Sequence, residues 1–402
     1  GGDYGPENIP SFGNFCCNGL VNAVREPHPH LKEVKKTYQY IKCTLKDPKN
    51  LTIAIKNWYD FTNLNAYVLK WSIVGDNGKM LAKGEQSIEA APHATTEVSL
   101  GGVRLPRNIR EAYLNLSWTP KKKSAFIGTD DEVAYDQFVL PANSQYRPTL
   151  AKLSEKPEIQ IDPKTGALTS YIYEGQEYLA SPVRLSLYRP ATDNDNREKK
   201  GGAKVWRKLG LNHLVQRVLS VKTSGHTTYS EVELLNDKNE TIGSATFEYT
   251  IRKDGILSVQ TRFVPDTTFV SSLARVGLVF EMPHSFNRVT YLGRGEHETY
   301  ADRKLSGRIG IYHTDAERMF HYYVRPQATG NRTDVRWMQV SDELGKGLSV
   351  WGEKSFEFSV SPFTDENIDA AGHINKLKRN GTVTVHLDAL QSGVGTATCG
   401  PG

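Results

Sequence analysis

Residues 291–312 have the sequence YLGRGEHETYADRKLSGRIGIY, which fits no ordinary amphipathic pattern. Five charged side chains fall between Arg294 and Arg303, and strand-like runs lie on either side of them. Gly293 and Gly295 indicate backbone positions that need a positive φ or a close approach by another segment. We therefore expect this stretch to be a loop with a specific role.

The composition of the 402-residue chain is that of a folded protein with two or three domains, each able to bury a core. Charged residues make up 24% of the chain, and the net charge of +5 is small for this length. Because the basic residues are spread rather than clustered, the sequence argues against a nucleic-acid-binding protein. No apolar run approaches the roughly 20 residues that a membrane helix needs, and no signal peptide is visible. We expect neither nucleic acid nor a membrane among its partners.

The four cysteines show no metal-ligand spacing. They are Cys16, Cys17, Cys43 and Cys399. Two adjacent cysteines close a disulfide with each other only with difficulty, so we expect free thiols. Free thiols favour a reducing or thiol-tolerant compartment, the cytoplasm first and the periplasm as the alternative.

Apolar periodicity divides the chain into three parts and a linker. Residues 1–36 are rich in glycine, proline and asparagine and end in a helical pattern at 30–36, which is too little to bury a core. Residues 37–140 alternate in short apolar runs separated by turn signals, among them Asp-Asn-Gly at 76–78, a good hairpin turn. About seven strands in this length indicate an immunoglobulin-like β-sandwich.

The rest of the chain is also rich in strand patterns. Residues 141–157 are polar and contain prolines, which is typical of a linker. From 158 to 402 strands recur, and the one helical pattern, at 366–376, follows Thr364, a candidate N-cap. So many strands imply a large antiparallel β-sandwich in which two sheets each bury one face.

Three aromatic residues stand in the strand-like runs of the first sandwich, Trp58, Tyr67 and Trp71. Aromatic residues in strands pack into cores more often than they serve as platforms for sugars. We expect these rings to form the aromatic core of that sandwich.

The motif at 291–303 resembles one found in the lactose-type β-galactosidases of glycoside hydrolase family two. In that family an aromatic residue precedes the pattern Gly-x-Gly-Pro-x-Glu-x-Tyr-x-Asp-Arg. The matching residues are Tyr291, Gly293, Gly295, Glu298, Tyr300, Asp302 and Arg303. Glu296 stands where the proline is usual.

Four further segments resemble the same family in the same order, so the resemblance covers nearly the whole chain. They are FCCNGLV at 15–21, YRPATDND at 188–195, YVRPQ at 323–327 with GNR and VRW after it, and the C-terminal positions His373, Leu377, Leu387-Asp388 and Gly393-Val394-Gly395. The resemblance implies the C-terminal part of a retaining β-galactosidase, which hydrolyses terminal β-D-galactosyl residues. Residues 1–36 would be the edge of its (β/α)8 catalytic barrel, and 158–402 a large sandwich of the galactose mutarotase type.

Catalysis with retention needs two carboxyl groups about 5 to 5.5 Å apart. In the family both belong to barrel strands that would precede Gly1, and no segment of this chain matches them. We therefore expect no catalytic residue here and no activity from this chain alone. Its partners would be the upstream barrel of the same protein and a galactoside substrate, and a homo-oligomer is left open. The alternative is an independent carbohydrate-binding or mutarotase-like sandwich without hydrolytic activity.

The resemblance assigns Phe15 and Asn18 to a site for sodium and galactose. Carbonyl and amide oxygens are suitable ligands for a hard cation such as sodium. The alternative is that both residues only shape a barrel loop. Magnesium would be bound in the barrel upstream.

Two further segments are implied to contact substrate. Asp193, Asn194 and Asp195 match a loop that in the family moves over the active site, although adjacent Asx residues also build plain turns, and both interpretations stay open. Cys399 lies where the family has a tryptophan that stacks on galactose, so we place it among the substrate-contacting residues. A cysteine has no aromatic ring and cannot stack on the sugar in this way.

The charges of the motif invite a catalytic interpretation. Glu296, Glu298, Asp302 and Arg303 are better explained as an ion-pair network that braces the glycine loop, since structural networks shift pKa values as catalytic sites do. The histidines His297, His313, His321 and His373 show no metal-ligand spacing with one another.

Overall fold

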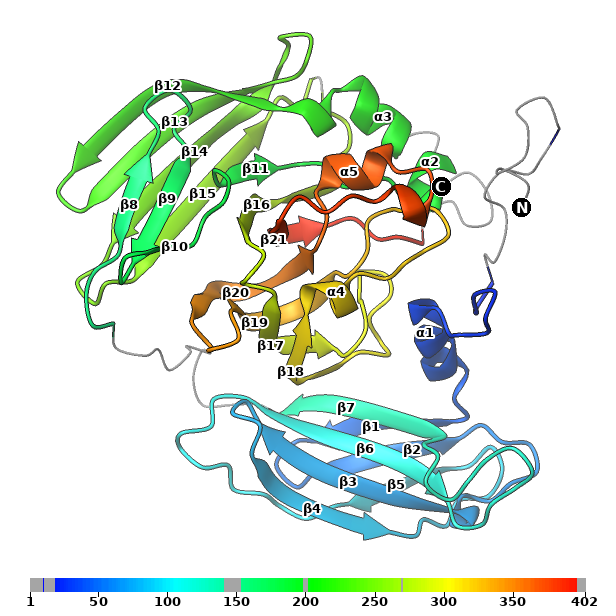
Figure 1. The fold of residues 1–402 in the computed structure, drawn as a ribbon. Helices are drawn as coiled ribbons and strands as arrows, with labels where there is room; N and C mark the ends of the chain where they lie inside the picture. Colours follow the sequence, from blue (N-terminus) through cyan, green and yellow to red (C-terminus); the bar gives the residue numbers. More distant parts are fainter. Residues whose placement is uncertain (1–9, 11–18, 141–152, 198–201, 269, 396–402) are drawn as a thin grey trace.

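The computed structural model describes residues 10, 19–140, 153–197, 202–268 and 270–395. These residues form a mainly β structure with several antiparallel sheets, which confirms the predicted fold class. Figure 1 shows a smaller β-sandwich at the bottom, a larger one above it, and helix α1 beside both. No helix in this part of the chain is long and apolar enough to cross a membrane.

Helix α1 (Pro29–Tyr38) begins with a proline, which is well tolerated in a first turn, and it confirms the helix predicted at 30–36. None of its residues is buried, so polar contacts must hold it in place. Glu33 accepts hydrogen bonds from the backbone N–H groups at 305–306, at 3.1 and 2.9 Å. Lys36 forms an ion pair with Asp136 at 2.6 Å. The helix therefore joins the larger sandwich to the smaller one.

The smaller sandwich consists of two sheets that share one core. One sheet has the order β1 (Ile41–Asp47), β2 (Thr52–Asn57), β5 (Thr95–Ser99), and the other the order β4 (Met80–Gln86), β3 (Tyr67–Gly75), β6 (Ala112–Pro120), β7 (Ala134–Leu140). Ile53 and Ile55 from the first sheet pack with Ile73 and Leu114 from the second. The predicted hairpin at 76–78 joins β3 to β4, with Gly78 at a φ of 75°.

The aromatic core of the smaller sandwich differs from the prediction. Trp118 is fully buried, whereas Trp58 is 49% exposed and Tyr67 and Trp71 are only partly buried. Trp118 lies on β6, which pairs with a strand on each side, while Trp58 follows the last residue of β2. The ring of Trp71 packs over Gly84 on the neighbouring strand. Trp58 is exposed because it lies beyond the end of its strand, whereas Trp118 lies within β6.

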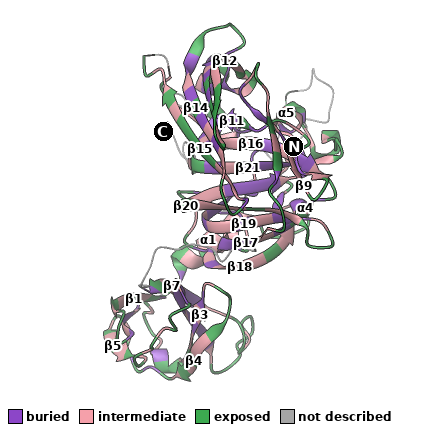
Figure 2. Ribbon diagram, turned by 90° about the vertical axis from the view of Figure 1, so that its left-hand side faces the viewer, coloured by how far each residue is buried: buried purple, intermediate pink, exposed green. Residues whose placement is uncertain are grey.

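Among the described residues, the larger sandwich contains three sheets rather than the two predicted. The order in the largest is β11 (Arg184–Ser186), β16 (Arg275–Pro283), β21 (Thr382–Gln391), β20 (Gly347–Ser361), β19 (Arg332–Ser341), β17 (Arg288–Gly295), β18 (Arg308–Asp315). The others are β12 (Val215–Ser224), β13 (Thr227–Leu235), β14 (Thr241–Ile251), β15 (Leu257–Pro265), and β10 (Gln176–Glu177), β9 (Leu168–Tyr173), β8 (Glu158–Ile161). One core cluster joins them, for example Phe247 of β14 with Phe280 and Val385 of the seven-stranded sheet. Figure 2 shows buried residues along these strands and exposed ones mainly at turns and edges.

The structure departs from the predicted elements in three places. Residues 291–295 belong to strand β17, so the predicted loop begins only after them. The short helices α2 (Asp193–Arg197), α3 (Ala203–Lys208) and α4 (Ala316–Met319) were not predicted, because four to six residues are too few to show a helical period. Helix α5 (Asp365–Ala370) begins as predicted, with the Thr364 hydroxyl accepting from Asn367 N at 3.2 Å, but ends six residues early.

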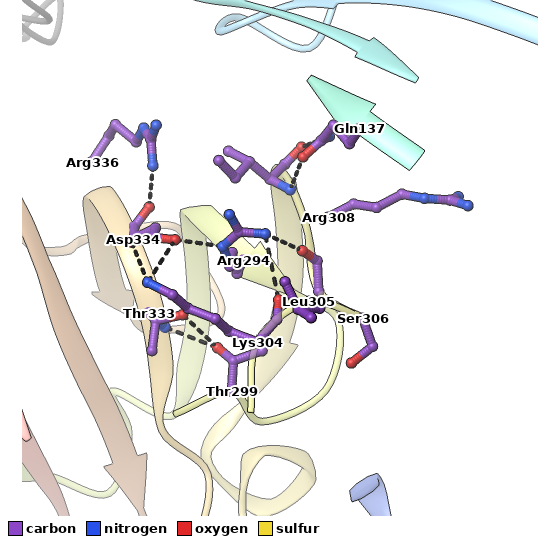
Figure 3. Close-up of polar contacts among 12 residues, drawn as sticks. Gln137, Arg294, Thr299, Lys304, Leu305, Ser306, Arg308, Thr333, Asp334 and Arg336 are labelled. Atoms are coloured by element: carbon purple, nitrogen blue, oxygen red, sulfur yellow. Dashed lines mark hydrogen bonds and ion pairs between the residues drawn. The ribbon is translucent and has the colours of Figure 1, made fainter. Parts of the chain in front are cut away.

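The two sandwiches contact each other through β7 and β18. Gln137 donates to the carbonyl of Ile309 at 2.8 Å and accepts from its N–H at 2.7 Å, as a neighbouring strand would (Figure 3). Arg336 forms a bidentate ion pair with Glu111, with both bonds at 2.7 Å. The predicted division at 36, 140 and 157 stays a prediction, since much of the first segment and of the linker lies outside the described residues.

Candidate functional site

The glycines of the motif are explained by close approach and not by a positive φ, since neither is among the residues with positive φ. A Cβ on Gly293 would lie 2.8 Å from the Val335 side chain, and one on Gly295 would fall on the hydroxyl of Tyr291. At the base of the loop, the Asp334 carboxylate forms ion pairs with Arg294 and Lys304, as Figure 3 shows. The loop is thus fixed to strand β19.

Glu298 is the buried centre of this loop. Its carboxylate accepts hydrogen bonds from Tyr323 Oη at 2.6 Å, Thr329 Oγ1 at 2.5 Å and Gly330 N at 2.8 Å, and pairs with Arg303. Burial opposes the charge, but the Arg303 guanidinium and these donors outweigh it and lower the pKa of Glu298 to about 2. The carboxylate is therefore ionised at neutral pH and braces the loop.

The other two acids of the predicted network have different partners. Glu296 pairs with Lys32 of α1 at 2.7 Å. Asp302 accepts hydrogen bonds from the N–H groups of Val394 and Gly395, at 3.0 and 2.7 Å. The motif thus contacts both α1 and the C-terminal segment, a role that its charge pattern did not indicate.

A cluster of histidines lies beside this loop. His28 Nδ1 and His321 Nε2 are 2.9 Å apart, and the ring of Tyr323 stacks on His28 with centroids 5.6 Å apart. The ring of His30 stacks on the ring of His28, with centroids 5.4 Å apart. Burial is the main cause that lowers the pKa of His30 and His321, so both favour the neutral form. No group of three or more His, Cys, Asp or Glu is placed to hold a metal ion within the described part of the chain.

The predicted substrate loop forms helix α2. Thr192 and Asp195 make a capping box, with Thr192 Oγ1 accepting from Asp195 N at 3.1 Å and the Asp195 carboxylate accepting from Thr192 N at 2.9 Å. The Asp195 side chain also pairs with the buried Arg189, at 2.8 and 3.1 Å. Asn194 donates to the carbonyl of Val394 at 2.6 Å, and Asp193 N bonds Gln327 at 3.3 Å. The Asx residues therefore bond to protein on several sides.

The C-terminal segment 391–395 meets this helix and the motif loop. Arg189 donates to the carbonyls of Ser392 and Gly393, at 2.5 and 2.8 Å. Since Asp302 bonds the following two amides, three elements that are distant in the sequence converge here. Figure 1 shows α2 close to the segment that follows β21.

Some predicted positions cannot be placed. Phe15, Asn18 and Cys399 lie outside the described residues. Arg189 was not predicted as part of the site. The Thr-x-x-Asp spacing at 192–195 is the signal that could have predicted α2, but nothing local to Arg189 indicates its partners at 391–393.

A large antiparallel sandwich with loops that converge on a polar site defines the class of this protein, and comparison with known sequences defines the family. The model for the beta-galactosidase small chain matches residues 154–402, and the model for beta-galactosidase domain 4 matches residues 53–141. The chain belongs to the beta-galactosidase small-chain family and corresponds to a C-terminal portion of a beta-galactosidase.

Individual relatives agree with this assignment. A beta-galactosidase of Priestia megaterium is 33% identical over 98% of this chain, which covers 39% of that protein. A beta-galactosidase of Actinobacillus pleuropneumoniae is 26% identical over 100% of this chain, which covers 40% of that protein. The chain thus spans about 40% of the length of these relatives.

Proposed function

We propose that this chain forms the C-terminal part of a retaining β-galactosidase and supplies loops that contact a terminal β-D-galactosyl residue. The observation that supports this most strongly is the match of two beta-galactosidase domain models, in order, over most of the chain. The two carboxyl groups that such chemistry requires would come from the upstream catalytic region.

The geometry is consistent with a supporting role at the edge of an active site. The motif loop, α2 and the segment 391–395 are joined by charged and backbone hydrogen bonds. Glu298 is occupied by four partners and has a lowered pKa, so it is unsuited to act as a general acid near neutrality. These loops would therefore hold substrate rather than transfer protons, with Asp193, Asn194 and Cys399 as contacts and the buried Asp195, held by Arg189, supporting them.

The immunoglobulin-like fold of the smaller sandwich and a sodium site are further parts of the proposal. Phe15 would offer a carbonyl oxygen and Asn18 an amide oxygen, which suits sodium, while magnesium would bind upstream. Replacing Asn18 with alanine in the full-length protein should weaken both sodium activation and galactoside binding. Unchanged sodium dependence would assign Asn18 a role in shaping the loop alone.

The test of the proposed function compares this chain with the full-length protein on a chromogenic β-galactoside. The full-length protein should turn the substrate over, and the purified chain should not. Turnover by the chain alone would contradict the proposal. If neither protein cleaves the substrate but the chain binds galactose, the independent carbohydrate-binding module is correct instead.

A further inference from the structure

We propose that Arg189 and Asp302 are positioning residues that hold helix α2 and the segment 391–395 in one fixed arrangement facing the substrate. This inference rests on the proposed function for its effect on catalysis, but the arrangement itself is testable without substrate. Neither residue would touch the reacting atoms. Each acts through the segments that it holds.

Arg189 uses all five of its N–H groups, although its side chain is fully buried. Nε and Nη2 donate to the Asp195 carboxylate at 3.1 and 2.8 Å. Nη1 donates to Gln391 Oε1 at 3.2 Å and to Ser392 O at 2.5 Å, and the second Nη2 proton goes to Gly393 O at 2.8 Å. A buried guanidinium with every donor satisfied has one orientation, so it fixes helix and segment relative to each other.

Asp302, which belongs to the motif loop, holds the same segment through its backbone N–H groups. Its two carboxylate oxygens each accept one backbone N–H, from Val394 at 3.0 Å and Gly395 at 2.7 Å. A Cβ on Gly393 would fall on this carboxylate, and one on Gly395 would lie 3.0 Å from it. The Gly-Val-Gly sequence is therefore needed so that the backbone can approach Asp302 closely.

Helix α2 depends on these contacts because it is only five residues long. A helix of this length has little stability of its own. The Asp195 carboxylate accepts from Arg189, which also bonds the C-terminal segment. The Asn194 amide donates to the carbonyl of Val394 in that segment. Movement of α2 as a lid would have to break the buried Arg189 pair, so we infer that α2 and the segment stay together or move together.

The experiment uses the full-length protein with three variants, Arg189→Lys, Asp302→Ala and the control Arg336→Lys. Lysine cannot replace five forked donors, and alanine removes both acceptors for the amides at 394–395. The control removes a bidentate pair of similar geometry that joins the two sandwiches and contacts neither α2 nor 391–395. Since Asp302 is exposed, its replacement should leave the fold intact even if the Arg189 variant folds poorly.

Two readouts separate this inference from the proposed function. Hydrogen exchange at Val394 and Gly395 should accelerate at least about tenfold in Asp302→Ala and in Arg189→Lys, and stay unchanged in the control. The kcat/KM for a chromogenic β-galactoside, per folded molecule, should fall about tenfold in the same two variants, with most of the change in KM. If wild-type protein lacks activity, the proposed function fails while the exchange result still tests the arrangement.

Gly393→Ala provides a double-mutant cycle. The alanine should impair exchange protection and kcat/KM in the wild-type background, but add little in the Asp302→Ala background, where its Cβ has room. Unchanged exchange at both amides, additive effects in the cycle, or an equal loss of kcat/KM in the control would each overturn the inference.

Discussion

Glu298 shows how one carboxylate can define a loop. It is buried, fully hydrogen bonded and paired with Arg303, while Glu296, two residues earlier, has a side chain that is 74% exposed. Two glutamates in one motif therefore have different physical roles.

Replacing Glu298 with glutamine should lower the free energy of unfolding by about 3 kcal/mol, because the buried Arg303 loses its counter-charge. Urea denaturation of the chain would measure this. Glu296→Gln is the matched control, and its exposed pair with Lys32 should contribute less than about 1 kcal/mol. Equal losses in the two variants would contradict the distinction.

Glu357 shows the opposite electrostatic behaviour. Burial raises its pKa to about 7, against a hydrogen bond from Asn331, and the nearby Asp388, its cross-strand partner, adds to the increase. When the pKa of a carboxyl is higher in the folded state than in the unfolded state, the group stabilises the folded state. This contribution is complete at a pH below 4.5, the pKa in the unfolded state, and is lost as the pH rises to about 7.

Glu357→Gln should therefore become more stable relative to wild type as the pH rises from 5 to 8. The change should be on the order of 1 to 3 kcal/mol, and the Asn331 bond can be kept by the glutamine carbonyl. Urea denaturation of both proteins at the two pH values measures it. A constant difference between them would refute the pKa assignment.

At the scale of elements, the motif loop and α1 form one polar unit. Glu33 caps two backbone N–H groups of the loop, Lys32 pairs with Glu296, and His297 bonds Ser306 Oγ at 2.7 Å. Burial, with the nearby charges of Lys32 and two arginines, lowers the pKa of His297 to about 4. The unit contains little apolar surface of its own, since α1 buries no residue.

Acid should loosen this unit before the rest of the molecule. A histidine with a lowered folded pKa contributes stability that is complete above pH 6.5 and is lost as the pH falls towards 4. In the variant His297→Gln, whose amide can still bond Ser306, stability should fall less between pH 7 and 5. Hydrogen exchange at Leu305 and Ser306 across this range is the measurement, and identical pH profiles for both proteins would count against it.

At the scale of the whole molecule, the two sandwiches are joined by a small core of their own. Tyr113 of the smaller sandwich is 1% exposed and packs with Leu292 and Ile309 of the larger one. Its hydroxyl lies at 2.5 Å from Glu111, which pairs with Arg336. Apolar burial surrounded by ion pairs makes this contact resemble a stable interface between domains.

Tyr113→Ala should separate the unfolding of the two sandwiches, which calorimetry would show as two transitions in place of one. The cavity should cost about 3 to 5 kcal/mol. Tyr249→Ala removes an equally buried ring from the core of the larger sandwich, and it should lower stability by a similar amount without separating the transitions. Separation in both variants, or in neither, would show that Tyr113 does not couple the sandwiches.

Sequence alone determined the strands, the turns and the family of this protein. Alternating apolar runs and glycine turns are local signals, so the hairpin at Gly78 appears where predicted, with a positive φ. Thr364 likewise marks the start of α5, because capping involves only the next three residues. The motif at 291–303 is a local signature of the family, because its residues are close together in the sequence.

Only the tertiary structure decided how the site is assembled. Arg189 reaches Gly393 across 204 residues, and Asp302 reaches Gly395 across 93, separations at which no local pattern carries information. The same reason explains why Trp118 and not Trp58 fills the smaller core: Trp118 lies within β6, between β3 and β7, whereas Trp58 lies beyond the end of β2, and these pairings join distant segments.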